Sequence, residues 1–189
     1  MGQAYGLERM SVGHINREFK ARCADPERIR ALLHEHEAEF IGVDEQRDTY
    51  FNVPKGRLKL REGNIEHALI RYERQDIAGH KTSHVILYHP LPDPALREIL
   101  ADAYGIRAIV EKRREIFFID NVKFHIDEVA GLGSFIEVEA IQRHAEHDEE
   151  FLERQCSAYA ALLGVHEADY IDVSYVDLID GLAERHAGT

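Results

Sequence analysis

Residues 125–140, HIDEVAGLGSFIEVEA, are the stretch from which the fold is most readily worked out. They predict two β-strands joined by a tight turn, because Gly131 and Gly133 supply the backbone freedom that a chain reversal needs. Side chains alternate between the two faces of a strand, so Glu137 and Glu139 share one face and aliphatic residues take the other. The hairpin therefore has one apolar face suited to a core and one face that carries carboxylates.

Six further segments are expected to be strands, because alternating polarity or a run of strand-forming residues marks them. They are residues 14–23, 46–53, 57–62, 66–75, 81–89 and 109–120. Most of these segments are joined by short turns, which is typical of an antiparallel sheet. In the first strand of the hairpin, His125, Asp127 and Val129 share a face by the same alternation.

Three helices are expected beside the strands. The segments 25–36 and 93–105 each begin with Asp-Pro, and aspartate caps a helix while proline fits its first turn. Residues 145–163 predict a longer helix, and the apolar tail 168–180 is expected to dock on the body of the protein. The second helix is expected to bury a stripe made of Leu96, Ile99, Leu100 and Ala103.

Composition and charge exclude several classes of protein. The net charge of −12 argues against duplex nucleic acid as the main ligand, because such binding needs a dominant basic surface. The sequence has neither an apolar run of about 18 residues for a membrane span nor a secretory signal. Cys23 and Cys156 lack metal-ligand spacing and predict reduced thiols of a cytoplasmic protein. One domain at 14–180 is expected, with a flexible leader at 1–13 and a flexible tail at 181–189.

The charged faces of the strands are segregated by sign. Arg57, Lys59 and Arg61 make one strand basic, and Lys112 and Arg114 make another basic, whereas the second strand of the hairpin is acidic. A half-buried sheet with its charged side in water is the simplest interpretation of any single strand. Solvated faces more often mix signs, however, and closure into a barrel removes the exposed edges of so many strands. The whole pattern predicts an α+β protein with an eight-stranded antiparallel closed barrel, charges inside and helices outside.

A lumen that holds carboxylates beside lysines and arginines implies a particular ligand. Such groups are costly to enclose without something to bind. Carboxylate oxygens suit Mg²⁺ or Mn²⁺, which also accept phosphate oxygens as ligands. Arginine and lysine neutralise the remaining phosphate charge. The pattern therefore predicts a triphosphate bound together with a divalent metal.

Five short segments carry a resemblance to a known family. They are Glu18-Phe19-Lys20, GRLKLRE at 56–62, RYERQD at 71–76, EKRRE at 111–115 and HIDEVAGLGSFIEVE at 125–139. Together they resemble the CYTH superfamily, the triphosphate tunnel metalloenzymes, and are most similar to the class IV adenylyl cyclases. The resemblance runs from Ile15 to about Ile179. It implies an eight-stranded antiparallel tunnel that binds nucleotide or inorganic triphosphates with Mg²⁺ or Mn²⁺.

The resemblance also implies roles for individual residues. The metal ligands would be Glu18, Glu137 and Glu139. The residues that contact phosphate would be Lys20, Lys59, Arg61, Arg74, Lys81, Lys112 and Arg114. The catalytic residues would be Lys112, Arg114 and Asp127, the last as a metal-site or substrate-orienting carboxylate. Arg57 could lie either at the tunnel mouth or on the surface.

One position departs from the pattern of the family. Its first strand carries Glu-x-Glu-x-Lys, whereas this chain has Asn16 in place of the first glutamate. An amide oxygen can still coordinate a metal, but it brings no charge. The substitution leaves a second metal, or tight metal binding, in question.

Three activities are compatible with these residues. In an adenylyl cyclase the ribose 3′-hydroxyl of ATP attacks the α-phosphorus, and in a triphosphatase water attacks the terminal phosphorus of tripolyphosphate or thiamine triphosphate. Both are in-line phosphoryl transfers, so the array of cations does not separate them. A module that binds a triphosphate without turnover is the third, suggested by Asn16. The cyclase is the first expectation, without nucleic-acid or membrane partners, and a homodimer is left open.

Overall fold

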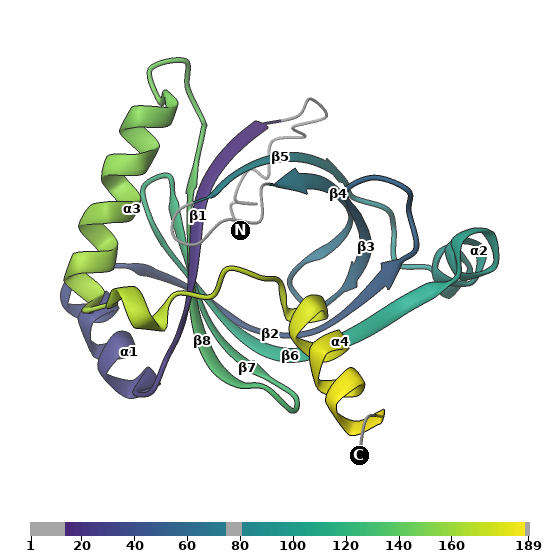
Figure 1. Ribbon diagram of the computed structural model, residues 1–189. Coiled ribbons are helices and arrows are strands. Elements are labelled where there is room, and N and C mark those ends of the chain that lie inside the picture. Colours follow the sequence, from purple (N-terminus) through teal and green to yellow (C-terminus); the bar gives the residue numbers. More distant parts are fainter. Residues whose placement is uncertain (1–13, 75–80, 188–189) are drawn as a thin grey trace.

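The computed structural model describes residues 14–74 and 81–187, which form a closed barrel of antiparallel strands with helices outside it (Figure 1). The strands are β1 (His14–Arg22), β2 (Glu39–Phe51), β3 (Arg57–Glu62), β4 (His67–Arg74), β5 (Lys81–Tyr88), β6 (Ile106–Ile119), β7 (Val122–Val129) and β8 (Gly133–Ile141). The helices are α1 (Pro26–Glu35), α2 (Pro94–Tyr104), α3 (Glu149–Leu163) and α4 (Tyr175–Ala187), with a short 3-10 helix at Glu167–Asp169. The order around the barrel is β1-β5-β4-β3-β2-β6-β7-β8, and the predicted eight-stranded barrel is confirmed.

The β7–β8 hairpin has the turn that its glycines predict. Gly131 and Gly133 adopt φ angles of 75° and 93°, which residues other than glycine rarely adopt. The two strands pair in register from Val122 opposite Ala140 to Val129 opposite Gly133. Phe124, Ile126, Ile136 and Val138 face out of the barrel, so Glu137 and Glu139 of β8 face in.

The main apolar core lies between one side of the barrel and two helices. Phe19 of β1, Phe124 of β7 and Val138 of β8 are buried there against Leu33 of α1 and Leu152 of α3. Figure 1 shows α1 and α3 on the same side of the barrel. Each large apolar side chain buried in this way contributes roughly 1.5–3 kcal/mol. This apolar layer decides which face of β1, β7 and β8 turns outward and therefore which face of these strands lines the lumen.

The helix starts follow the aspartates that precede them. Asp25 and Asp93 cap α1 and α2, each with proline in the first turn, as predicted. Asp148 accepts a hydrogen bond from the backbone N–H of Phe151, so α3 begins at Glu149 rather than at residue 145. Strand β2 begins earlier than expected, because its first residues already pair with β6 from Glu39 onward.

The predicted buried stripe of α2 is wrong. The side chain of Ile99 is 63% exposed and no residue of α2 is buried; Leu96 and Leu100 are only half-buried, and Ala103 is exposed. The helix lies on the opposite side of the barrel from α1 and α3 (Figure 1). It contacts β3 through an ion pair in which Arg97 lies 2.9 Å from Glu62. An apolar stripe shows that a helix could bury one face. Whether that face is buried depends on whether another element of the fold packs against it.

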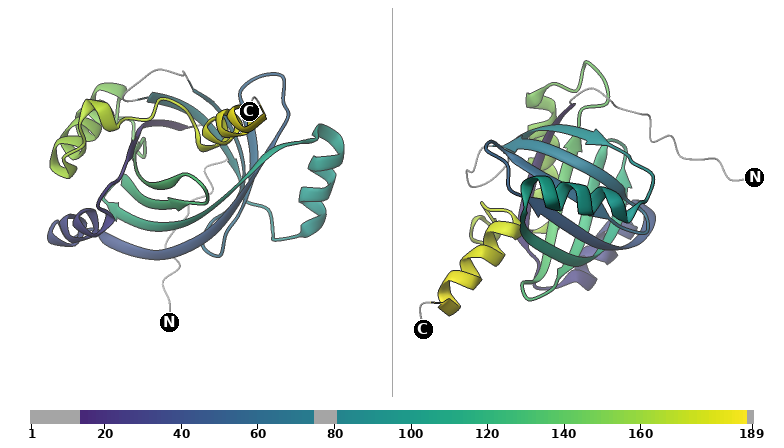
Figure 2. Two further views of the ribbon diagram at one scale, coloured as in Figure 1. Left: turned by 60° about the horizontal axis from the view of Figure 1, so that its bottom comes forward. Right: turned by 90° about the vertical axis from the view of Figure 1, so that its right-hand side faces the viewer.

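The C-terminal segment docks on the barrel, as expected. The backbone N–H of Ile171 donates to the carbonyl oxygen of Lys20 at 2.8 Å, and Val176 of α4 packs in one apolar cluster with Val110 of β6 and Val129 of β7. Figure 2 shows α4, in yellow, beside the barrel. Helix α4 continues to Ala187, through most of the expected tail; Asp180 holds its second turn by an ion pair with Arg107 at 2.7 Å. The expected leader, 1–13, and residues 188–189 lie outside the described residues. No described helix is long and apolar enough to cross a membrane.

Candidate active site in the barrel lumen

Strand register brings the predicted acidic and basic residues to the inside of the barrel. Directly opposite residues in paired strands point to the same face. Glu18 lies opposite Glu139, and Lys20 lies opposite Glu137 across β1 and β8. On the other side of β8, Glu137 lies opposite His125 of β7. Residues far apart in the sequence therefore stand side by side on one inner wall.

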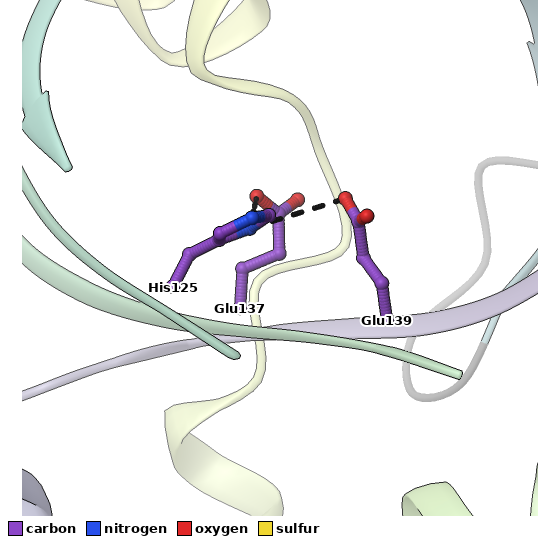
Figure 3. Close-up of side chains that lie close together, drawn as sticks. All are labelled: His125, Glu137 and Glu139. Atoms are coloured by element: carbon purple, nitrogen blue, oxygen red, sulfur yellow. Dashed lines mark ion pairs between the residues drawn. The ribbon is translucent and has the colours of Figure 1, made fainter. Parts of the chain in front are cut away.

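A histidine and two glutamates converge on this wall (Figure 3). Nδ1 of His125 lies 3.4 Å from a carboxylate oxygen of Glu137 and 4.0 Å from one of Glu139. One potential ligand atom from each residue lies within 4.8 Å of the other two. Burial, with the positive charges of Arg114 and Lys123, lowers the pKa of His125 to about 3. The imidazole is therefore neutral at physiological pH.

The two glutamates differ in their electrostatic surroundings. Although burial alone would raise it, the charges of Lys20 and Arg114 hold the pKa of Glu137 well below its usual range. At Glu139 the charges of Lys123 and Arg114 act in the same direction but are outweighed. Burial and the charge of Glu137 raise the pKa of Glu139 to about 7, and the carboxylate of Glu18 across the β1–β8 pair contributes in the same direction. A further positive charge near Glu139 would be stabilising.

Arg114 lies at the centre of a buried ion-pair network. Its guanidinium donates to Asp127 at 2.6 and 2.5 Å and to Glu137 at 2.7 Å. The other oxygen of Glu137 pairs with Lys20. Tyr175, the first residue of α4, reaches into the barrel and donates its hydroxyl to Asp127 at 2.7 Å. Two predicted catalytic residues, Arg114 and Asp127, therefore bind each other directly.

A second network is centred on Asp48, which the sequence analysis missed. This fully buried carboxylate accepts from Lys59 and Lys112 at 2.8 Å each and from Arg61 at 2.9 and 3.0 Å. Although burial would raise it, these cations hold the pKa of Asp48 well below its usual range. Burial lowers the pKa of Lys112 to about 7; Asp48 opposes the change, and Arg61 adds to it. Three predicted phosphate-binding side chains thus meet at one carboxylate.

Glu66, directly before β4, was also missed. It accepts from Arg61 at 2.6 Å and pairs with Lys123.

The side chains of Arg74 and Lys81, two predicted phosphate-binding residues, lie outside the described residues. Arg57 donates to Asp177 of α4 at 2.9 Å and its side chain is 12% exposed, which favours the end of the barrel over the open surface. There it lines a cavity of about 100 Å³.

One part of the lumen wall is apolar. Ile70 of β4 lies opposite Lys59 on one side and Leu87 of β5 on the other, so it shares their inward face. Around it cluster Ala68, Tyr72 and Val85, again on β4 and β5. The sequence does not predict this patch, because either face of β4 and β5 could have turned toward the lumen. The lumen therefore presents cations and carboxylates on most strands and this apolar surface on β4 and β5. A second apolar cluster on the inward face, at Tyr50, Val110, Val129 and Phe135, packs against Tyr175 and Val176 of α4.

A closed antiparallel barrel with lysines, arginines and carboxylates gathered inside it defines the class of triphosphate tunnel proteins. Comparison with family models agrees, since the model of the CYTH domain matches residues 14–175. The chain belongs to the CYTH family. Enzymes of this family act on triphosphates and depend on a metal.

Solved structures share the fold. The PH1012 protein from Pyrococcus horikoshii is 24% identical over 86% of this chain and 98% of its own, with a TM-score of 0.68. A candidate adenylate cyclase from Vibrio parahaemolyticus is 20% identical over 89% and 99%, with a TM-score of 0.73. A candidate adenylyl cyclase from Hippeastrum, described as having a dominant triphosphatase activity, is 13% identical over 88% and 95%, with a TM-score of 0.58. At these identities the likeness shows the fold alone. No match was found among curated proteins.

The residues on the inner wall fit a divalent cation. Glu137 and Glu139 supply carboxylate oxygens, which suit Mg²⁺ or Mn²⁺. Two buried polar groups beside them, the ring nitrogens of His125 and Oδ1 of Asn16, make no hydrogen bond within the described part of the chain. Buried polar atoms normally have a partner, so these atoms are consistent with a site built to hold an ion.

Proposed function

We propose that this protein is an adenylyl cyclase of class IV type, which converts ATP to cyclic AMP and pyrophosphate. The observation that carries the proposal is the division of the lumen into a charged part and an apolar part. A nucleotide needs both, because its phosphates require cations whereas its base requires an apolar surface. Inorganic tripolyphosphate has no group that would use the wall formed by β4 and β5.

The charged part supports roles for the predicted phosphate-binding residues. Lys59, Arg61 and Lys112 already converge on one carboxylate, so a phosphate group at that place would meet three donors at once. Lys20 and Arg114 form a second pair of donors, which meet at Glu137. Donors arranged in this way before the substrate arrives stabilise the charge that develops on the transferring phosphoryl group.

Asp127 acts as a positioning residue in this proposal. Although burial would raise it, Arg114 holds the pKa of Asp127 below its usual range, so the carboxylate is a weak proton acceptor at neutral pH. Its contacts with Arg114 and Tyr175 instead fix the direction of the guanidinium. Glu18, Glu137 and Glu139 would hold a divalent metal, which would supply positive charge for the phosphates and acidify the attacking hydroxyl.

Product identity tests the proposal. The purified protein is incubated with ATP and either Mn²⁺ or Mg²⁺, and nucleotides are separated by chromatography. Cyclic AMP with an equal amount of pyrophosphate is the expected result, lost in Arg114→Met. The formation of ADP and orthophosphate would overturn the cyclase and favour a triphosphatase. Thermal stabilisation by ATP with no product would favour a binding module.

A further inference from the structure

We propose that His125 is a nitrogen ligand of the metal, with Glu137 and Glu139 as its carboxylate partners, and that the site binds Mn²⁺ and Co²⁺ in preference to Mg²⁺. This inference deepens the proposed function, on which it rests for the role of the ion. The residues implied by family resemblance were three glutamates, so the histidine changes the chemistry of the site. The argument depends on where the imidazole lies and on what it does not contact.

The spacing of the three side chains matches shared coordination. Two ligand atoms about 2.1 Å from one ion lie about 3.0 Å apart at a right angle and about 3.4 Å apart at the tetrahedral angle. Nδ1 of His125 is 3.4 Å from Glu137 and 4.0 Å from Glu139. The first separation already has the tetrahedral value, and the second needs a shift of about 0.6–1.0 Å in the Glu139 side chain.

Among the described residues, the imidazole makes no hydrogen bond that would explain its position. The side chain of His125 is 1% exposed, and neither ring nitrogen makes a hydrogen bond within residues 14–74 and 81–187. An unsatisfied polar group at a buried position costs about 1–3 kcal/mol. The ring nevertheless points at two carboxylates rather than away from them (Figure 3). A cation between the ring and the carboxylates would satisfy a nitrogen and offset the negative charges together.

Glu137 can bind an ion without losing its existing contacts. One of its oxygens pairs with Lys20, and the other accepts from Arg114 at 2.7 Å while facing His125. Each carboxylate oxygen has two lone pairs, so a lone pair of the second oxygen is still available. Arg114 would then hold the ligand in place from behind, as groups around metal ligands commonly do.

The donor set determines which metal is preferred. Carboxylate oxygens suit both Mg²⁺ and Mn²⁺, whereas imidazole favours transition metals, for which the affinity of such sites rises from Mn²⁺ to Co²⁺. The amide of Asn16 on β1 adds no charge that would strengthen the attraction for Mg²⁺. A site with one nitrogen and two carboxylates therefore discriminates against Mg²⁺.

Pulsed electron paramagnetic resonance of bound Mn²⁺, with the full chain free of nucleotide, tests the nitrogen ligand directly. Modulation from a directly bound ¹⁴N nucleus is expected in the wild type and absent in His125→Asn. The matched control is His84→Asn, since His84 is an exposed histidine on β5, and it should keep the signal. Absence of the signal in the wild type, or its persistence in His125→Asn, would overturn the proposal.

Calorimetric titration with Co²⁺ and Mg²⁺ tests the preference. His125→Asn should weaken Co²⁺ binding about 10-fold or more and leave Mg²⁺ binding nearly unchanged. Equal weakening of both metals would contradict the inference. The spectroscopic result is independent of turnover: a nitrogen signal without cyclic AMP would refute the proposed function alone, and cyclic AMP without the signal would refute this inference alone. A wild-type spectrum also decides the question if the variant does not fold.

Discussion

The two faces of β1, β7 and β8 are built from alternate residues of the same strands, yet one buries mainly apolar side chains and the other buries charged ones. The outer face packs apolar residues such as Val138 against α1 and α3, and ion pairs such as Arg17–Glu153 lie at the margin of that contact. The inner face, one residue away at Glu137, carries charges that are expensive to bury. The comparison indicates that the outer face stabilises the fold, whereas the inner face holds groups arranged for a charged ligand.

The largest expected effect comes from Asp48→Asn. The change leaves Lys59, Arg61 and Lys112 buried without their shared counter-charge, so the free energy of unfolding should fall by about 3–5 kcal/mol. Tripolyphosphate should then raise the melting temperature more in the variant than in the wild type, since its oxygens replace the lost carboxylate. Thermal melts with and without tripolyphosphate measure both quantities. An equal rise in the two proteins would show that these cations do not face the ligand.

Leu152→Ala is the matching change on the outer face. It should lower the free energy of unfolding by about 2–5 kcal/mol through the cavity it leaves between α3 and the barrel. Because no ligand binds there, the rise in melting temperature caused by tripolyphosphate should equal that of the wild type. A larger rise in this variant would break the distinction between the two faces.

Lys112 gives a smaller effect that depends on pH. Its pKa of about 7 means that the amine is mostly neutral at pH 8 in the free protein. Bound phosphate favours the charged form and raises that pKa, so binding at pH 8 should take up a proton. Calorimetry in two buffers with different ionisation enthalpies should give different apparent enthalpies.

Lys112→Met is the control for this proton. The variant should lose the buffer dependence at pH 8 and bind tripolyphosphate about 10-fold more weakly, as expected for one charge-assisted hydrogen bond. It should remain folded, because Asp48 keeps its contacts with Lys59 and Arg61. Proton uptake that persists in the variant would assign the titration to another group.

The smallest effect is expected far from either face. Arg154→Ala removes an exposed pair with Glu150 on α3, so the free energy of unfolding should change by less than about 0.5 kcal/mol. Tripolyphosphate affinity should be unchanged, because the pair lies outside the barrel. A chemical denaturation curve and a titration check the two expectations, and a clear loss of affinity would mean that surface charge contributes to binding.

Much of the inner wall could be predicted from sequence because alternation is a local property. Glu137 and Glu139 stand two residues apart among aliphatic residues, so their shared face is visible without a structure. The same alternation placed His125 with Asp127, but the histidine was not assigned to the metal. Asp48 was missed because its strand also carries charged residues on the outer face, at Glu45 and Arg47, so the alternation gives no contrast.

By itself, the sequence determined the number of strands, the β7–β8 turn, the starts of α1 and α2, and the residues that share a face within a strand. These follow from backbone freedom, capping and the two-residue period of a strand, all of which act between neighbours. Only the tertiary structure decided which cation meets which carboxylate, as Lys112 meets Asp48 and Arg114 meets Asp127. Those partners depend on the register between strands and on closure of the barrel by β1 and β8, which join residues more than a hundred positions apart.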